Sequence, residues 1–132
     1  MFGLDTHILV RYLAQDDPRQ AASATRVIER ELTAEEPGYI SLVVLAEVVW
    51  VMSSVYGADR STIAGVVEGL LASPKLKLQS SEVVWQALSS FRESRADFSD
   101  ALIAHLAKAA SCKTTLTFDR HASRLAGFQL LP

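Results

Sequence analysis

Short apolar runs alternate along the chain with longer segments in which apolar residues recur at helical spacing. This alternation is typical of a parallel sheet whose strands are joined by covering helices. The pattern predicts strands at residues 1–4, 39–40, 76–78, 114–117 and 128–131. It predicts helices at residues 8–14, 19–32, 42–55, 60–72, 81–91 and 100–110, and a short one at 120–125. With 132 residues, of which 49% are hydrophobic, the chain is expected to form a single α/β domain with its own core.

The composition excludes several classes of protein. Cys112 is the only cysteine, so neither an internal disulfide nor a zinc site built on thiolates is expected. The longest uncharged apolar run, residues 39–46, is too short to cross a bilayer, and the opening residues lack the basic region of a signal peptide. We therefore expect a soluble, cytoplasmic protein. The net charge of −2 is not the basic balance that is typical of nucleic-acid-binding domains.

Two acidic residues directly follow predicted strands. Asp5 comes after the first strand, and Asp119 comes after residues 114–118. Ligands of open parallel sheets bind beyond the carboxyl ends of the strands, so both positions favour a functional site. Each also has a structural alternative, because Asp5 is a candidate N-cap of the next helix and Asp119 a candidate turn residue.

Three further acids belong to predicted helices. Glu47 lies in a helix that is apolar almost all round, for which Ser41 is the expected N-cap. The helix is expected to be buried, and a buried carboxylate requires a cation or a hydrogen-bond donor. Asp97 and Asp100 stand three residues apart at the start of a later helix, so both can point to one side. Asp97 is also a candidate cap of that helix.

Carboxylates that converge repel one another unless a divalent cation joins them. Oxygen ligands without an accompanying cluster of His or Cys select Mg²⁺ or Mn²⁺ over zinc. His7, His105 and His121 are too scattered for a zinc-protease motif, and the latter two are expected to be packing or surface residues. The reaction class that follows is metal-assisted hydrolysis of a phosphoester by an activated water.

Two alternatives belong to other classes. A phosphatase with an aspartate nucleophile would carry D-x-D-x-T after the first strand, whereas Asp5 is followed by Thr6 and His7. A catalytically silent interaction module would have lost part of the acidic set, which is complete here.

Four segments of the chain carry a family resemblance: LDTHILVRYLAQDDPRQA, ISLVVLAEVVWVM, ADFSDALIAHLAKAASC and TLTFDRHASRLAGFQLL. In order and spacing they resemble the PIN-domain ribonucleases, and among these the VapC-type toxins of bacterial toxin–antitoxin pairs. The resemblance covers essentially the whole chain. It implies a three-layer α/β/α fold with a central parallel sheet of about five strands. It also implies Mg²⁺-dependent endonucleolytic cleavage of RNA, commonly tRNA or rRNA, by a homodimer whose cognate antitoxin inserts its tail into the active-site groove.

The resemblance also assigns individual residues. The acids of the metal site correspond to Asp5, Glu47, Asp100 and Asp119. Asp97 matches an additional acid of close relatives, and hydroxyl residues that orient the acids correspond to Thr6, Ser41 and Thr117. His7 departs from the pattern, because the family usually has Asn there. Histidine still donates a hydrogen bond, so activity is expected to be retained with a changed metal preference or pH dependence.

Overall fold

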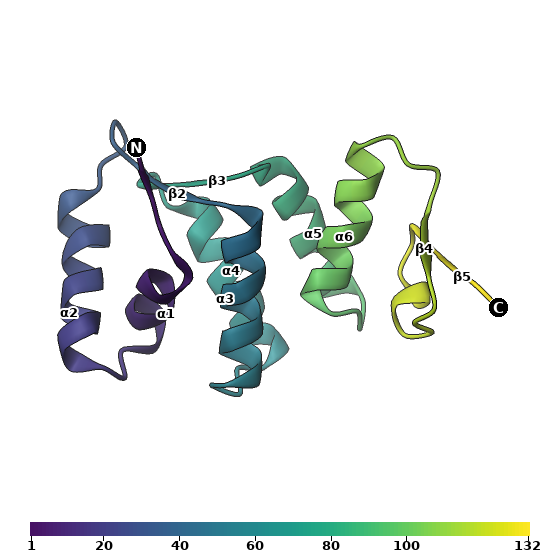
Figure 1. The fold of residues 1–132 in the computed structure, drawn as a ribbon, viewed down its shortest axis with the longest axis horizontal. Helices are drawn as coiled ribbons and strands as arrows, with labels where there is room; N and C mark the ends of the chain where they lie inside the picture. Colours follow the sequence, from purple (N-terminus) through teal and green to yellow (C-terminus); the bar gives the residue numbers. More distant parts are fainter. The chain divides into compact units, whose positions relative to one another are not determined.

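The computed structural model describes residues 1–132, which divide into two compact units, Met1–Gln79 and Ser80–Pro132 (Figure 1). Each unit has its own helices and its own parallel strands. The prediction of one domain therefore remains a prediction. No helix has both the length and the apolar character that crossing a membrane requires.

The first unit is built on a three-stranded parallel sheet. Its strands are β1 (Phe2–Gly3), β2 (Gly38–Ile40) and β3 (Leu76–Leu78), in the order β1-β2-β3. Phe2 pairs with Gly38, and Gly38 pairs in turn with Leu76. Because parallel neighbours need a crossover, helices occupy both connections. They are α1 (Thr6–Ala14), α2 (Pro18–Arg26), α3 (Leu42–Ser54) and α4 (Arg60–Ala72).

All four helices of this unit begin at a polar cap. The carboxylate of Asp17 accepts from the backbone N–H of Gln20 at 3.0 Å, and the hydroxyl of Ser41 accepts from Val44 at 3.2 Å. Asp5 and Asp59 occupy the corresponding positions before α1 and α4. The first N–H groups of a helix have no partner within it, so these side chains fix where each helix starts.

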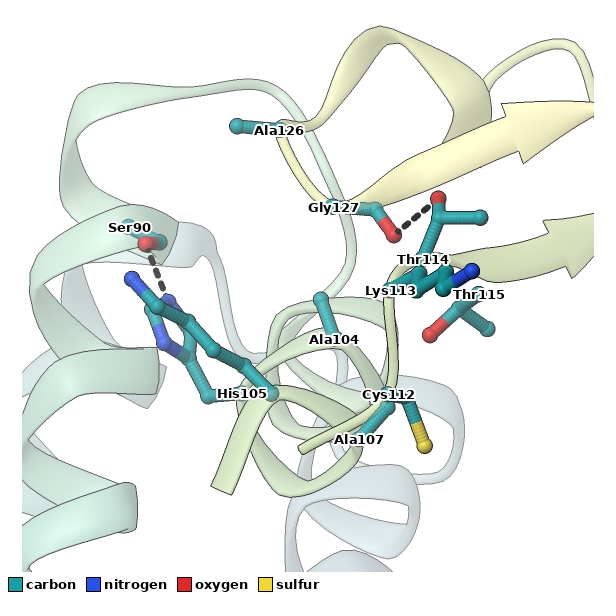
Figure 2. A pocket seen from close by; sticks show the side chains of 11 residues that line it. Ser90, Ala104, His105, Ala107, Cys112, Lys113, Thr114, Thr115, Ala126 and Gly127 are labelled. Atoms are coloured by element: carbon teal, nitrogen blue, oxygen red, sulfur yellow. Dashed lines mark hydrogen bonds between the residues drawn. The ribbon is translucent and has the colours of Figure 1, made fainter. Parts of the chain in front are cut away.

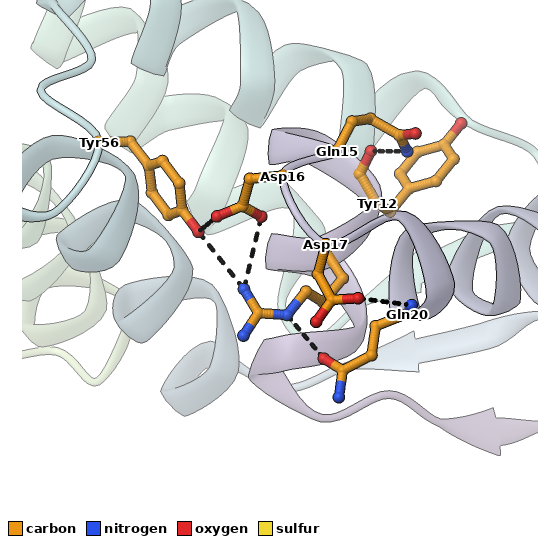
Figure 3. A network of polar contacts seen from close by, with 7 residues as sticks. Tyr12, Gln15, Asp16, Asp17, Gln20 and Tyr56 are labelled. Carbon is orange, nitrogen blue, oxygen red and sulfur yellow. Dashed lines mark hydrogen bonds and ion pairs between the residues drawn. The ribbon is translucent and has the colours of Figure 1, made fainter.

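A polar network joins the corner between α1 and α2 to the residues after α3 (Figure 3). The guanidinium of Arg11 donates to Gln20 at 2.7 Å and lies 3.5 Å from the carboxylate of Asp16. The Tyr56 hydroxyl donates to Asp16 at 2.7 Å, which lowers the pKa of that carboxyl. The network ties α1, which follows Asp5, to the end of α3, which carries Glu47.

The second unit pairs two helices with two strands. Helix α5 (Ser81–Glu93) packs against α6 (Phe98–Ala109), and the rings of Phe91 and Phe98 meet edge to face with centroids 5.8 Å apart. Strands β4 (Thr115–Thr117) and β5 (Phe128–Leu130) are parallel, and the 3₁₀ turn η2 (Ala122–Arg124) lies between them in sequence.

The predicted α/β class with parallel strands is confirmed, but some details differ. The five strands form two sheets, of three and two strands, rather than one central sheet. The helix predicted at residues 19–32 leaves α geometry after Arg26 and continues as a π-helical turn, η1 (Val27–Glu31). The segment predicted to be helical at 120–125 forms only the 3₁₀ turn, in which the N–H groups of Arg124 and Leu125 donate to the carbonyls three residues before them. Ser80 stands at the N-cap of α5 but adopts a left-handed conformation with φ of 51° and makes no cap hydrogen bond.

Gly38 gives the tightest test of packing in the first unit. A Cβ at this position would lie 2.7 Å from Leu4 Cδ1 and 2.8 Å from Leu32 Cδ1, both buried. Overpacking of this kind costs about 1–3 kcal/mol, so Gly38→Ala is expected to lower the free energy of unfolding by that amount in urea denaturation. Gly3→Ala in the neighbouring strand is the matched control, because a Cβ there meets nothing within 4 Å. Equal stabilities of the two variants would contradict this account of the core.

Candidate active site

Glu47 lies on the exposed face of α3, and the expectation that it is buried is wrong. The helix buries Leu45, Val48, Val49 and Met52. Val43 and Trp50, four residues before and three after Glu47, are 69% and 63% exposed. One face of the helix is therefore open even though its residues are almost all apolar. Its assignment as a site residue now depends on the family resemblance and not on the cost of burying a charge.

Asp5 combines a structural contact with a free oxygen. It is exposed, and its Oδ1 accepts from the backbone N–H of Thr6 at 2.7 Å as the N-cap of α1. The carboxylate retains a second oxygen for which the structure gives no protein partner. The cap interaction therefore holds the carboxylate at the carboxyl end of β1 without consuming it. His7, in the first turn of α1, is also exposed.

The three hydroxyl residues predicted to orient the acids have different surroundings. The Thr6 hydroxyl is buried and has no hydrogen-bond partner. The Ser41 hydroxyl is used in the cap of α3. The Thr117 hydroxyl, at the end of β4, accepts from the backbone N–H of Asp119 at 3.0 Å. Of the three hydroxyls, that of Thr117 is hydrogen-bonded to one of the acids that follow a strand, Asp119.

Asp97 and Asp100 stand at the start of α6. Asp97 occupies the N-cap position, but its side chain makes no cap hydrogen bond, so both carboxylate oxygens are left out of the helix. Asp100 lies in the first turn and is half-buried, whereas Asp97 is exposed. A helix start is also a place where carboxylates are favoured by the helix dipole.

Asp119 is held by the backbone around it. Its Oδ1 accepts from the N–H of His121 at 2.8 Å and from that of Ala122 at 3.3 Å, while its own N–H donates to Thr117. These bonds fix one carboxylate oxygen in the turn before η2 and leave Oδ2 without a hydrogen-bond partner. Asp119 therefore initiates a turn, which is the structural role considered for it, and its carboxylate is held in a fixed orientation as well.

The acids of the second unit interact electrostatically. The pKa of Asp100 is raised, first by burial and then by the negative charges of Asp97 and Asp119, while the charge of His121 acts in the opposite direction. Like charges so close destabilise the ionised form of the most buried member. The structure thus brings together Asp97, Asp100 and Asp119, which are separated by up to 22 residues in the sequence.

His121 is a member of this cluster that sequence reasoning missed. Its Nε2 donates to the backbone carbonyl of Arg95 at 2.9 Å, which orients the ring beside the acids. The expectation of an ordinary surface or packing residue was based on its isolation from other histidines. The signal that was present is its position two residues after Asp119, in the same turn.

These residues fit a hard divalent cation. The acidic donors of the second unit are carboxylate oxygens, and a cation among them would offset the repulsion that, after burial, raises the pKa of Asp100. In neither unit, however, do three His, Cys, Asp or Glu side chains already converge closely enough to hold an ion. Asp5 and Glu47 belong to the first unit, where α1 packs against α3.

The electrostatic cluster makes a stability prediction. The pKa of Asp100 is higher in the folded protein than in the unfolded chain. The protonated carboxyl therefore contributes to the stability of the folded protein. This contribution is fully present below the unfolded pKa and is lost as the pH rises through the folded pKa. Near neutrality, Asp100→Asn is therefore expected to raise the free energy of unfolding in chelator by up to about 1 kcal/mol, allowing for solvent screening. Chemical denaturation at pH 7 and at acid pH measures this gain, which should vanish at the lower pH. Glu35→Gln, at an exposed loop position of the other unit, is the control, and an equal gain there would contradict the role of the cluster.

Comparison with known proteins gives the family. No curated protein matches the chain. The sequence profile of the PIN domain matches residues 3–128, which include every acid described above. PIN domains are typically metal-dependent nucleases, and this chain belongs to the PIN-domain family.

Proposed function

We propose that the protein is a Mg²⁺-dependent endoribonuclease whose metal site is formed by Asp5, Glu47, Asp100 and Asp119. The observation that carries this proposal is the half-buried Asp100, whose ionised form is disfavoured first by burial and then by the charges of Asp97 and Asp119. A protein gains nothing in stability from such a cluster without a cation. The match to the PIN domain supports nuclease chemistry at these acids.

The donor set suits Mg²⁺ or Mn²⁺, since it consists of oxygens without thiolates. When bound, such an ion supplies charge for the scissile phosphate and a water of lowered pKa as the nucleophile. Asp97 is an additional ligand in this proposal. The side chains of Thr6, Ser41 and Thr117 support the acids without contacting the reacting atoms.

The protein's own contribution is to hold carboxylates in place before substrate arrives. Asp119 is fixed by the N–H groups of His121 and Ala122, and Asp5 by that of Thr6. A carboxylate that is already oriented loses little freedom when it binds, so more of the interaction is available to the reaction. Glu47 lies on an exposed helix face, where both substrate and metal have access to it.

The finer assignment is a VapC-type toxin that cleaves tRNA or rRNA in the cytoplasm. It is supported by the motifs around the acids, and in particular by the run that starts at Leu4 and the D-x-L-I-A helix that contains Asp100. The partners implied are a cognate antitoxin and a second copy of the chain. Exposed indole rings of Trp50 and Trp85, 63% and 43% accessible, support contacts with another polypeptide.

Cleavage is tested with labelled RNA, with and without Mg²⁺. Asp100→Asn is expected to reduce the rate by about 100-fold or more, because it removes a ligand charge without changing the shape of the side chain. Wild-type protein should also be stabilised against thermal unfolding by Mg²⁺, and the variant should not. A p-nitrophenyl phosphate assay run in parallel separates nuclease from phosphatase activity. Full cleavage by Asp100→Asn in chelator-controlled buffer would overturn the site.

Asp5 requires a variant that separates its two roles. Asn caps helices about as well as Asp, so Asp5→Asn keeps the N-cap of α1 while removing the charge. We expect a loss of cleavage comparable to that of Asp100→Asn with the unfolding free energy unchanged within about 0.5 kcal/mol. Unchanged cleavage by this variant would reduce Asp5 to a capping residue.

The proposed assembly is tested by mass. Light scattering is expected to give twice the 14.4 kDa of one chain for the isolated protein. A monomer at all concentrations would contradict the dimer.

A short gene immediately upstream that encodes a DNA-binding protein, and that restores growth when it is co-expressed, would support the toxin assignment. Sequencing of RNA ends after induced expression would identify the target.

A further inference from the structure

The second unit contains a cavity of about 390 Å³ that is separate from the acidic cluster. It is bordered by the last turns of α6, the start of β4, Ser90 of α5 and the residues before β5 (Figure 2). Its volume lies in the range of small-molecule sites. Asp100 and Lys108 are eight residues apart on α6, so the two ends of the helix are separated by about 12 Å at 1.5 Å per residue.

The charged groups around this cavity are positive. Lys108 and Lys113 line it, and no Asp or Glu does. No salt bridge involves either ammonium group. The pKa of His105 is lowered, first by burial and second by the charge of Lys108, so the ammonium group of Lys108 acts on the imidazole at the cavity wall. Unpaired cations around a concave site favour an anionic ligand.

The helix end beside the cavity does not cancel this charge. The carboxyl end of a helix normally presents unpaired carbonyl oxygens, which repel anions. Here the carbonyls of Leu106, Ala107 and Lys108 accept from the N–H groups of residues 110, 112 and 111, respectively. Ser111 adopts a left-handed φ of 68°, which lets the chain turn back toward the end of the helix. Three of the last four carbonyls of α6 are thus satisfied, which reduces the negative potential of the helix end beside the lysines.

Hydroxyl groups and small apolar residues complete the lining. The Thr115 hydroxyl is buried and has no hydrogen-bond partner, whereas that of Thr114 donates to the Gly127 carbonyl at 3.0 Å. On the other side, the Ser90 hydroxyl and His105 Nε2 are 2.7 Å apart (Figure 2). The lining also includes residues with little or no side chain, which are Ala104 and Ala107 on α6 and Ala126 and Gly127 before β5.

We propose that this cavity binds a nucleotide, whose phosphate is attracted by the positive charges of Lys108 and Lys113 and whose nucleoside lies against the small residues of the lining. Two ammonium groups match the charge of a phosphate. The small side chains of Ala104, Ala107 and Ala126 leave room in the cavity for a base or sugar. The ligand is either a free nucleotide or one unit of an RNA strand, and binding does not depend on the proposed cleavage.

The test uses the full ¹⁵N-labelled chain in chelator, so that metal-dependent events are absent. AMP is expected to shift the amide resonances of Thr115, Ala126 and Gly127 in a saturable manner, and adenosine or inorganic phosphate alone should bind more weakly. The double variant Lys108→Ala/Lys113→Ala is expected to lose about tenfold or more in AMP affinity, since each charge-assisted contact contributes to binding. Both lysines are exposed, so the variant should fold.

The matched control is Arg19→Ala/Lys77→Ala, which removes two exposed positive charges from the first unit. Its AMP affinity should equal that of the wild type. A short oligoribonucleotide that binds at the same amides much more tightly than AMP would identify the RNA strand as the source, and equal affinity would identify the free nucleotide. The proposal is overturned if AMP causes no shift at about 10 mM, if both double variants lose affinity equally, or if the shifts lie at Asp97 and Asp100 instead.

Discussion

Parallel strand pairing is the constraint on which the structure depends. Since parallel neighbours need a crossover helix, each crossover places a helix start after the carboxyl end of a strand. The sequence places polar side chains at these junctions: Asp5 follows β1, Ser41 follows β2 and Asp119 follows β4. At such a junction a carboxylate can start a helix or turn with one oxygen and keep the other accessible to a ligand. Structural and chemical roles therefore coincide, as the cap made by Asp5 and the turn made by Asp119 illustrate.

The acidic cluster of the second unit is an arrangement that folding alone does not favour. Asp97 stands at an N-cap without making the cap bond, and Asp100 is half-buried beside two like charges. Because Asp97 makes no cap hydrogen bond, α6 lacks the stabilisation of about 1 kcal/mol that an N-cap side chain usually gives. The cost is consistent with selection for binding a cation, and it is concentrated at the start of α6, where the helix dipole offsets part of it.

The sequence predicted the elements well where local signals were strong. Helix α4 begins and ends at the predicted residues, and Ser41 caps α3 as expected. The exposure of Glu47 could not be predicted, because periodicity reports which residues are apolar but not which faces of a helix are covered. The division of the strands between two sheets likewise depends on pairing between distant segments, about which runs of two or three residues carry little information. His121 was overlooked because its neighbours in space, Asp100 and the Arg95 carbonyl, are far from it in sequence.

The net charge of the whole chain does not reveal how positive and negative side chains are distributed within the second unit. The chain as a whole carries −2, which argues weakly against a nucleic-acid ligand. Within the second unit, however, carboxylates gather at the amino end of α6, and Lys108 and Lys113 lie beside its carboxyl end. The separation of about 12 Å along the helix exceeds the Debye length of about 8 Å at physiological salt, so each end presents its own sign to a ligand. A phosphate approaching the lysines therefore meets little of the repulsion from the acids, and the average charge says nothing about either site.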